Sequence, residues 1–157
     1  MAKPWKILDL NPDESLKQCL HKIALTRIQE TFSYESATMK GEDLEALHDM
    51  RVSARRLRAV LRIFRDCFSK KKLKKQDARL QSLIRTLGAV RERDVFLESL
   101  SAYKKSLEPA DRKVIDLLIA RETTARVLDR RNLMREIKFL RRTNYADSFA
   151  AFVKSSL

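Results

Sequence analysis

Apolar side chains recur every three or four residues along most of the chain, and this spacing is typical of amphipathic helices. No segment shows the alternation of apolar and polar residues that is typical of a strand, and no hairpin turn appears. With glycine, proline and capping residues taken as boundaries, the pattern predicts helices over residues 14–38, 43–68, 73–87, 91–106, 109–142 and 145–153.

Glycine and proline positions support these boundaries. Gly88 directly follows the third apolar stripe, where a left-handed residue commonly closes a helix. Pro109 stands at the start of the fifth stripe, a position that helices accept. We expect this long fifth helix to be broken near residues 130–132.

The composition agrees with a helical fold. The chain contains only two Gly and three Pro, too few for a turn-rich β fold. We therefore predict an all-α protein with a single domain over residues 1–157. Its simplest architecture is an antiparallel bundle of the four-helix type, with a long fifth helix and a short terminal helix.

The predicted helix over residues 43–68 carries a row of basic side chains along one side. The members recur at steps of three and four residues, so they project in the same direction. Like charges at this spacing repel each other and destabilise an isolated helix. Such a row is most easily explained by a polyanion that lies along it. The row consists of His48, Arg51, Arg55, Arg58 and Arg62.

The net charge of the chain is concentrated around this row. The chain holds 34 Lys and Arg against 21 Asp and Glu, which gives a net charge of +13. Residues 51–75 contain eleven of these bases and one acid, Asp66. A localised patch focuses an electrostatic field. We therefore expect a phosphate-rich partner, with an anionic membrane surface as the second choice.

Two apolar strips border the row. A broad face that includes Leu57 and Leu61 must meet the core, and a smaller strip of Val52, Ala59 and Ile63 lies on nearly the opposite side. Because a helix with two apolar faces packs on both, we expect the row to line a groove. Low-dielectric walls strengthen the attraction of such a row for anions.

Further basic residues extend the candidate site. Lys72, Lys75 and Arg79 share one face of the next predicted helix, and we expect them to form the opposite wall of the groove. Arginine suits this task because its planar guanidinium group donates two hydrogen bonds to phosphate oxygens. Arg56 lies about 120° from the row by helix geometry, and it either contacts the ligand or has a structural role.

The roles of two residues remain open at this stage. His48 is either a structural group with its hydrogen bonds satisfied or a donor to the anion. Arg91 falls in the first turn of the predicted helix 91–106, where it either points into the groove or forms local ion pairs. Asp94, in the same turn, suits the positive end of that helix and is placed to orient an arginine of the patch.

Two sequence motifs resemble those of a known family. Residues 48–64 read H-x-x-R-V-x-x-R-R-L-R-x-x-L-R-x-F, and residues 87–95 read L-G-x-V-R-E-x-D-V. In this order and at this separation, they resemble the two motifs of the CHAD family, the conserved histidine α-helical domain. The resemblance is specific over about residues 40–100. Beyond Pro109 it is limited to general helical character.

The resemblance implies a helical bundle that binds inorganic polyphosphate through a basic central groove. The function that it favours is a non-catalytic polyphosphate-binding module, and some relatives associate with polyphosphate granules. The basic positions of the family correspond here to His48, Arg51, Arg55, Arg56, Arg58, Arg62 and Arg91.

The chain departs from the family in two respects. Glu92 stands where Asp is commoner. Family members also usually contain two similar four-helix halves, whereas this chain has one copy of the first motif and corresponds to a CHAD-like half. A single half either works alone or pairs with a second copy, and an isologous homodimer is the natural substitute for an internal twofold.

Nucleic-acid binding is the alternative function. Base readout usually needs Asn, Gln or Ser among the arginines, and the row offers almost none. Proteins that bind single strands interleave aromatic side chains for stacking, but Phe64 and Phe68 are expected to face the core. We therefore do not expect nucleic acid to be the partner.

A phosphohydrolase that acts on polyphosphate is the least favoured function. Metal-dependent phosphoryl transfer needs clustered carboxylates to hold Mg²⁺, and the sequence places no such cluster near the patch. It also contains no P-loop and no arrangement that would activate a serine or cysteine. The sequence therefore predicts no catalytic residue, no metal site and no cofactor.

Several features bear on the location of the protein. Cys19 and Cys67 lie within apolar helical patterns without metal-ligand spacing, which favours reduced thiols in an intracellular protein. The first residues show no export signal, and the apolar stretches are too short to span a bilayer. We expect a cytoplasmic protein without a membrane partner, located at polyphosphate granules if the resemblance holds.

Overall fold

The computed structural model describes residues 3–155, and within this range the chain forms helices and no strands. The all-α prediction is confirmed. The elements, in chain order, are α1 (Leu16–Ser33), α2 (Glu35–Lys40), α3 (Leu44–Ile63), a 3-10 turn η1 (Arg65–Cys67), α4 (Lys70–Lys105), α5 (Arg112–Arg142) and α6 (Tyr145–Lys154).

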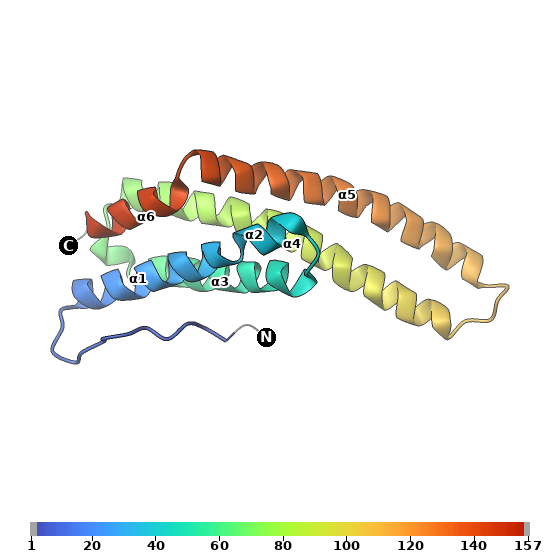
Figure 1. The fold of residues 1–157 in the computed structure, drawn as a ribbon, viewed down its shortest axis with the longest axis horizontal. Helices are drawn as coiled ribbons and strands as arrows, with labels where there is room; N and C mark the ends of the chain where they lie inside the picture. The colour runs from blue at the N-terminus through green and yellow to red at the C-terminus, as the bar shows by residue number, and fades with distance from the viewer. Residues whose placement is uncertain (1–2, 156–157) are drawn as a thin grey trace.

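The helices form an antiparallel bundle from which one hairpin projects (Figure 1). Helix α3 packs between α1 and α4, and α4 packs along α5. Helix α6 turns back from the end of α5 and packs against α1. The second half of α4 and the first half of α5 extend beyond the other helices as a long hairpin (Figure 1).

Local signals begin and end the helices at the N-terminal side. Ser15 and Gln18 form a capping box at the start of α1, because each side chain bonds to the backbone N–H of the other. The Asp43 side chain accepts from the N–H of Glu45 and caps α3. Gly41 closes α2 with a φ of 74°, the left-handed conformation that glycine adopts most readily.

The structure differs from the predicted boundaries in four places. The helix predicted over residues 43–68 ends at Ile63 and is followed by the 3-10 turn η1. The helix predicted over residues 14–38 is divided at Tyr34 into α1 and α2. The helices predicted over residues 73–87 and 91–106 are a single helix, α4. The helix α5 is unbroken at residues 130–132 and begins at Arg112, because Pro109 lies in the preceding turn.

Gly88 explains why the prediction divided α4. The residue is buried in the middle of the helix, and its φ is not positive. A β-carbon at this position would lie 3.5 Å from the Nε of Arg51 and 4.0 Å from its Nη2. Gly88 therefore lies inside α4 beside an arginine of α3, where a β-carbon would make ordinary contacts, and it does not end a helix.

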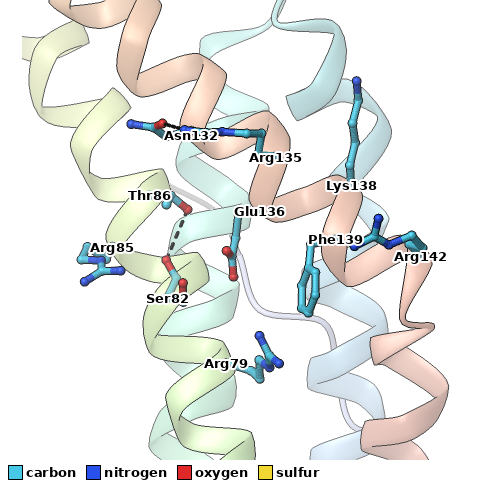
Figure 2. Close-up of a pocket in the computed structure, with 10 residues that line it drawn as sticks. All are labelled: Arg79, Ser82, Arg85, Thr86, Asn132, Arg135, Glu136, Lys138, Phe139 and Arg142. Carbon is cyan, nitrogen blue, oxygen red and sulfur yellow. Dashed lines mark hydrogen bonds between the residues drawn. The ribbon is translucent and has the colours of Figure 1, made fainter.

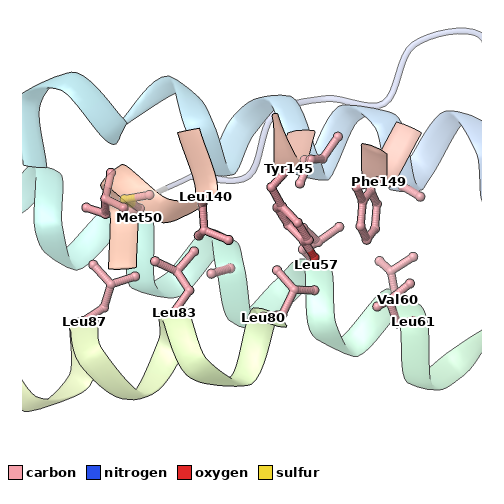
Figure 3. Close-up of a cluster of buried hydrophobic side chains, with 14 of the residues drawn as sticks. Met50, Leu57, Val60, Leu61, Leu80, Leu83, Leu87, Leu140, Tyr145 and Phe149 are labelled. Carbon is pink, nitrogen blue, oxygen red and sulfur yellow. The ribbon is translucent and has the colours of Figure 1, made fainter. Parts of the chain in front are cut away.

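The core fills the space between α3, α4, α5 and α6 (Figure 3). Met50 and Leu57 of α3 face leucines of α4, with Leu140 of α5 and Phe149 of α6 closing the cluster. Burial of each such side chain stabilises the fold by roughly 1.5–3 kcal/mol. The buried Tyr145 hydroxyl donates to the Gln76 carbonyl at 3.4 Å, and burial raises the pKa of this phenol.

Ion pairs hold the projecting hairpin together. Arg93 of α4 pairs with Glu122 and Asp129 of α5, and the hydrogen bond to Asp129 raises the pKa of Arg93. Arg126 of α5 pairs with Asp94 of α4, whose carboxylate is largely buried. The expectation that Asp94 sits at a helix start and orients an arginine of the patch is therefore wrong. Because α4 continues through this region, Asp94 faces α5 instead.

Replacement of Gly88 by alanine tests its position inside α4. Glycine within a helix costs roughly 0.5–1 kcal/mol relative to alanine, and the added β-carbon meets Arg51 at ordinary contact distance. We expect Gly88→Ala to raise the free energy of unfolding by about that amount, measured by urea denaturation.

Gly41→Ala is the matched control for this measurement. Gly41 has a positive φ, and the Arg130 guanidinium occupies the space of the added carbon. This variant should lose stability. If Gly88→Ala also lowered the free energy of unfolding, by about 1 kcal/mol, Gly88 would be the left-handed helix end that the sequence predicted.

Candidate anion-binding site

The amphipathic pattern of α3 places the basic row beside α4. Leu57 and Leu61 are fully buried against the core. Residues on the opposite part of the helix circumference are therefore left at the surface. Arg55 and Arg62 are exposed, whereas Arg51 is half-buried on the side that faces α4.

A shallow groove follows the row between α3 and α4. Arg55, Arg58 and Arg62 line one hollow of about 470 Å³, which Ile84 of α4 closes from the other side. A second hollow of about 560 Å³ adjoins it, since both are lined by Arg62 and Ile63. We call the two together the α3–α4 groove.

The second hollow extends the positive charge toward the start of α4. Arg65 follows α3, and Lys70 and Lys74 come from the first turns of α4. Within residues 3–155, five of the cations along the α3–α4 groove have no hydrogen bond or ion pair with a carboxylate on the opposite wall, and Arg65 among them pairs with its neighbour Asp66 at 3.7 Å. These cations are Arg55, Arg62, Arg65, Lys70 and Lys74.

Arg58 has a carboxylate partner. Its Nε lies 2.6 Å from Asp77 Oδ1 and its Nη2 lies 3.0 Å from Oδ2, so the pair is bidentate. The hydrogen bond to Asp77 raises the pKa of the guanidinium group. The local sequence indicated a row without compensating acids. The structure shows that Arg58 is compensated, because its acid comes from another helix.

The other end of the row contains buried polar atoms without partners. The Arg51 side chain lies against Gly88, and its Nε is buried without a hydrogen bond among residues 3–155. His48 Nδ1 is likewise buried without a hydrogen bond among residues 3–155. Unsatisfied buried polar groups cost free energy. The interpretation of His48 as a histidine with all its hydrogen bonds satisfied is therefore not supported.

Arg56 lies on the other side of α3 and binds an internal carboxylate. Its Nη1 is 3.3 Å from Oε1 of Glu30, a fully buried residue of α1. Arg27 pairs with the other oxygen of Glu30, and the backbone N–H of Trp5 donates to Oε1 at 3.3 Å. Arg56 thus belongs to a structural cluster that joins α3, α1 and the N-terminal arm. Of its two predicted roles, the structure favours the structural one.

The opposite wall of the groove is not formed as predicted. The Arg79 guanidinium lies 4.5 Å from the centre of the Phe139 ring of α5, in a different cavity. Lys72 and Lys75 are exposed and share the helix face of Arg79. Leu73, Leu80 and Leu87 pack into the core and fix the rotation of α4, which places two of its other lysines, Lys70 and Lys74, along the groove.

Arg91 lies in the interior of α4, so it does not begin a helix. Within residues 3–155 it forms no hydrogen bond or ion pair, and its side chain is half-buried. It follows Ile84 and Gly88 at helical spacing and therefore shares the face of α4 that meets α3. This position is at the His48 end of the row.

One basic cluster was missed by the sequence analysis. Arg135, Lys138 and Arg142 recur along α5 at steps of three and four residues, and they line a cavity that faces α4 (Figure 2). The same spacing that revealed the row on α3 was present here. It was overlooked because acidic residues elsewhere on this long helix dilute its net charge.

The chain matches a known protein family. The family model of the CHAD domain matches residues 22–157. Because the match covers most of the chain, this protein belongs to the CHAD family. Among curated proteins, none matches the chain.

A solved structure has the same fold. The crystal structure of the CHAD domain from the plant Ricinus communis superposes with a TM-score of 0.76 at 24% sequence identity. The match covers 98% of this chain and 51% of the plant chain, so this protein spans about half the length of that relative.

The described residues, 3–155, also bear on two other classes of site. No helix in this range has the length and apolar character needed to cross a bilayer. No group of three or more His, Cys, Asp or Glu side chains in the described range is arranged to hold a metal ion. Cys19 and Cys67 are both free thiols and are half-buried.

The structural role of Arg56 can be tested against a neighbour in sequence. Arg56→Ala removes one partner of the buried Glu30 carboxylate, and a loss of this kind costs about 1–3 kcal/mol. Arg55→Ala removes an exposed side chain and should change stability by less than about 0.5 kcal/mol. Urea denaturation measures both. Equal stability of the two variants would contradict the assignment of Arg56.

Proposed function

We propose that this protein is a non-catalytic module that binds inorganic polyphosphate in the α3–α4 groove. The observation that carries the proposal is a set of exposed cations along the groove that, within residues 3–155, lack a carboxylate partner across it. These cations are Arg55, Arg62, Arg65, Lys70 and Lys74. Membership of the CHAD family supports the same ligand, which the motif resemblance implies.

The chemistry of the groove suits a flexible chain of phosphates. Arginine donates paired hydrogen bonds to phosphate oxygens, and lysine adds mobile charge. Arg55 and Arg62 are seven residues, about two helical turns, apart on the same side of α3, so phosphates along one flexible chain can meet both guanidinium groups. The unpartnered donors of Arg51 and His48 would extend the contact toward Arg91.

The proposal assigns no catalysis to this groove. Asp77 is the carboxylate that lines it, and both of its oxygens accept hydrogen bonds from Arg58. A carboxylate engaged in this way is poorly placed to bind Mg²⁺ or to activate a water molecule. We therefore propose binding without hydrolysis. Release of orthophosphate from polyphosphate by the purified protein would contradict it.

Nucleic acid is the competing polyanion. Binders of single strands offer aromatic rings on which bases stack, but Phe64 and Phe68 of this chain pack against the core. We therefore expect polyphosphate to displace DNA at equal phosphate concentration, and the converse result would favour nucleic acid.

Removal of the exposed arginines tests the site. We expect Arg55→Ala/Arg62→Ala to weaken retention of long-chain polyphosphate at least about tenfold in a filter-binding assay, because two phosphate contacts are lost. The slope of affinity against salt concentration should also become shallower, since fewer counterions are released. Circular dichroism should show unchanged helicity.

A matched variant controls for the loss of net charge. Lys113 and Arg121 are exposed on the projecting part of α5, far along the chain from the groove. Lys113→Ala/Arg121→Ala removes the same number of charges and should retain polyphosphate almost as well as the wild type. Similar losses in both double variants would show that only overall charge matters.

We also propose that a second copy of the chain covers the apolar strip beside the row. Val52 of this strip is half-buried, but Ile63 is 73% exposed and Ala59 is exposed, so the latter two have no cover among residues 3–155, contrary to the expectation that the whole strip packs against a neighbour. A second copy placed there would supply a further wall to the groove. The twofold greater length of the plant CHAD chain supports such a pairing.

Light scattering tests this pairing. The wild-type protein is expected to be a dimer at tens of micromolar, and Ile63→Glu should shift it to monomer by placing a charge in the contact. Leu117 is 74% exposed on the projecting hairpin, and Leu117→Glu should leave the dimer intact. A monomeric wild-type protein would refute the pairing.

A further inference from the structure

The cavity between α4 and α5 is separate from the α3–α4 groove. It measures about 710 Å³ and shares no lining residue with the groove (Figure 2). This volume is in the range of small-molecule sites, roughly 300–1,000 Å³. The proposed polyphosphate site does not account for this cavity.

The cavity contains a concentration of positive charge. Two arginines come from α4, and three further cations lie at steps of three and four residues on α5, where like charges repel. None of the five forms an ion pair with a carboxylate among the residues that the structure describes. The five are Arg79, Arg85, Arg135, Lys138 and Arg142.

Phe139 orients two of these cations. The guanidinium groups of Arg79 and Arg142 lie 4.5 Å and 5.8 Å from the centre of its ring. Cation–π contacts of this kind stabilise both positions. Because the ring already carries two guanidinium groups, it is not open for stacking of a nucleobase. The cations are therefore arranged for an anion without an aromatic part.

Glu136 adds a requirement that phosphate alone does not meet. Its carboxylate lies among the cations, and Oε1 is buried without a hydrogen bond among residues 3–155 (Figure 2). The Thr86 hydroxyl donates to the carbonyls of Leu83 and Ser82, so its oxygen remains an acceptor. The Glu136 oxygen needs a donor from the ligand, and the Thr86 oxygen is free to accept a second one.

We propose that this cavity binds a phosphorylated polyol. Phosphate groups of such a ligand would meet the arginines and Lys138, and a free hydroxyl would donate to Glu136. Inorganic polyphosphate supplies the anions but has no alcohol hydroxyl, so it leaves the Glu136 oxygen unsatisfied. The carboxylate thus makes the cavity selective against the polymer that the α3–α4 groove is proposed to bind.

Isothermal titration calorimetry on the full chain tests the selectivity. The probes are myo-inositol 1,4,5-trisphosphate and inorganic triphosphate, which have equal numbers of phosphates but differ in alcohol hydroxyls. We expect the inositol compound to bind at least about tenfold more tightly, because it gains a charge-assisted hydrogen bond. Glu136→Gln should reduce this preference to about twofold or less. Equal affinity for the two probes would overturn the proposal.

Two double variants show which site each ligand uses. Arg135→Ala/Lys138→Ala should weaken the binding of inositol trisphosphate at least about tenfold and leave polyphosphate retention unchanged. Arg55→Ala/Arg62→Ala should have the opposite effect. If inositol trisphosphate binding were lost only in the second variant, it would bind the α3–α4 groove and the proposal would fail. A wild-type protein that bound the inositol compound but no polyphosphate would contradict only the function proposed for the groove.

Discussion

The structure depends on burial of the apolar face of α3 between α1 and α4. Each of the side chains buried there stabilises the fold by roughly 1.5–3 kcal/mol. Repulsion between neighbouring like charges on the same helix opposes this by only roughly 0.2–0.5 kcal/mol per pair. The core therefore holds Arg51, Arg55, Arg58 and Arg62 on one side of α3, and an anion bound in the groove, as proposed, would relieve the repulsion that remains.

Helical periodicity was sufficient to predict the class of fold and the direction of the basic row. It failed at Gly88, because a glycine inside a helix and a glycine that ends a helix look alike in one sequence. The break predicted at residues 130–132 failed because Arg130 has a tertiary partner. Its guanidinium donates to the carbonyls of Thr38 and Met39 at the end of α2.

The row on α3 could be predicted from the sequence, but its partners could not. Spacing showed that Arg56 points away from the row, and Glu30 of α1 gives the reason. Asp77 was not recognised as the partner of Arg58 because the pairing depends on the rotation of α4 about its own axis. That rotation is set by which leucines enter the core, and it also directs Arg79 to α5 and not to the groove.

The projecting α4–α5 hairpin divides the molecule into regions of unequal local stability. Its outer part leaves Val114 and Leu117 mostly exposed, and charge pairs such as Arg93 with Glu122 provide much of its cohesion. Electrostatic contacts near water weaken as ionic strength rises, whereas apolar burial does not. We therefore expect the hairpin tip to open without unfolding of the bundle, and its amides to exchange hydrogen with solvent sooner than those around Leu57 and Leu83.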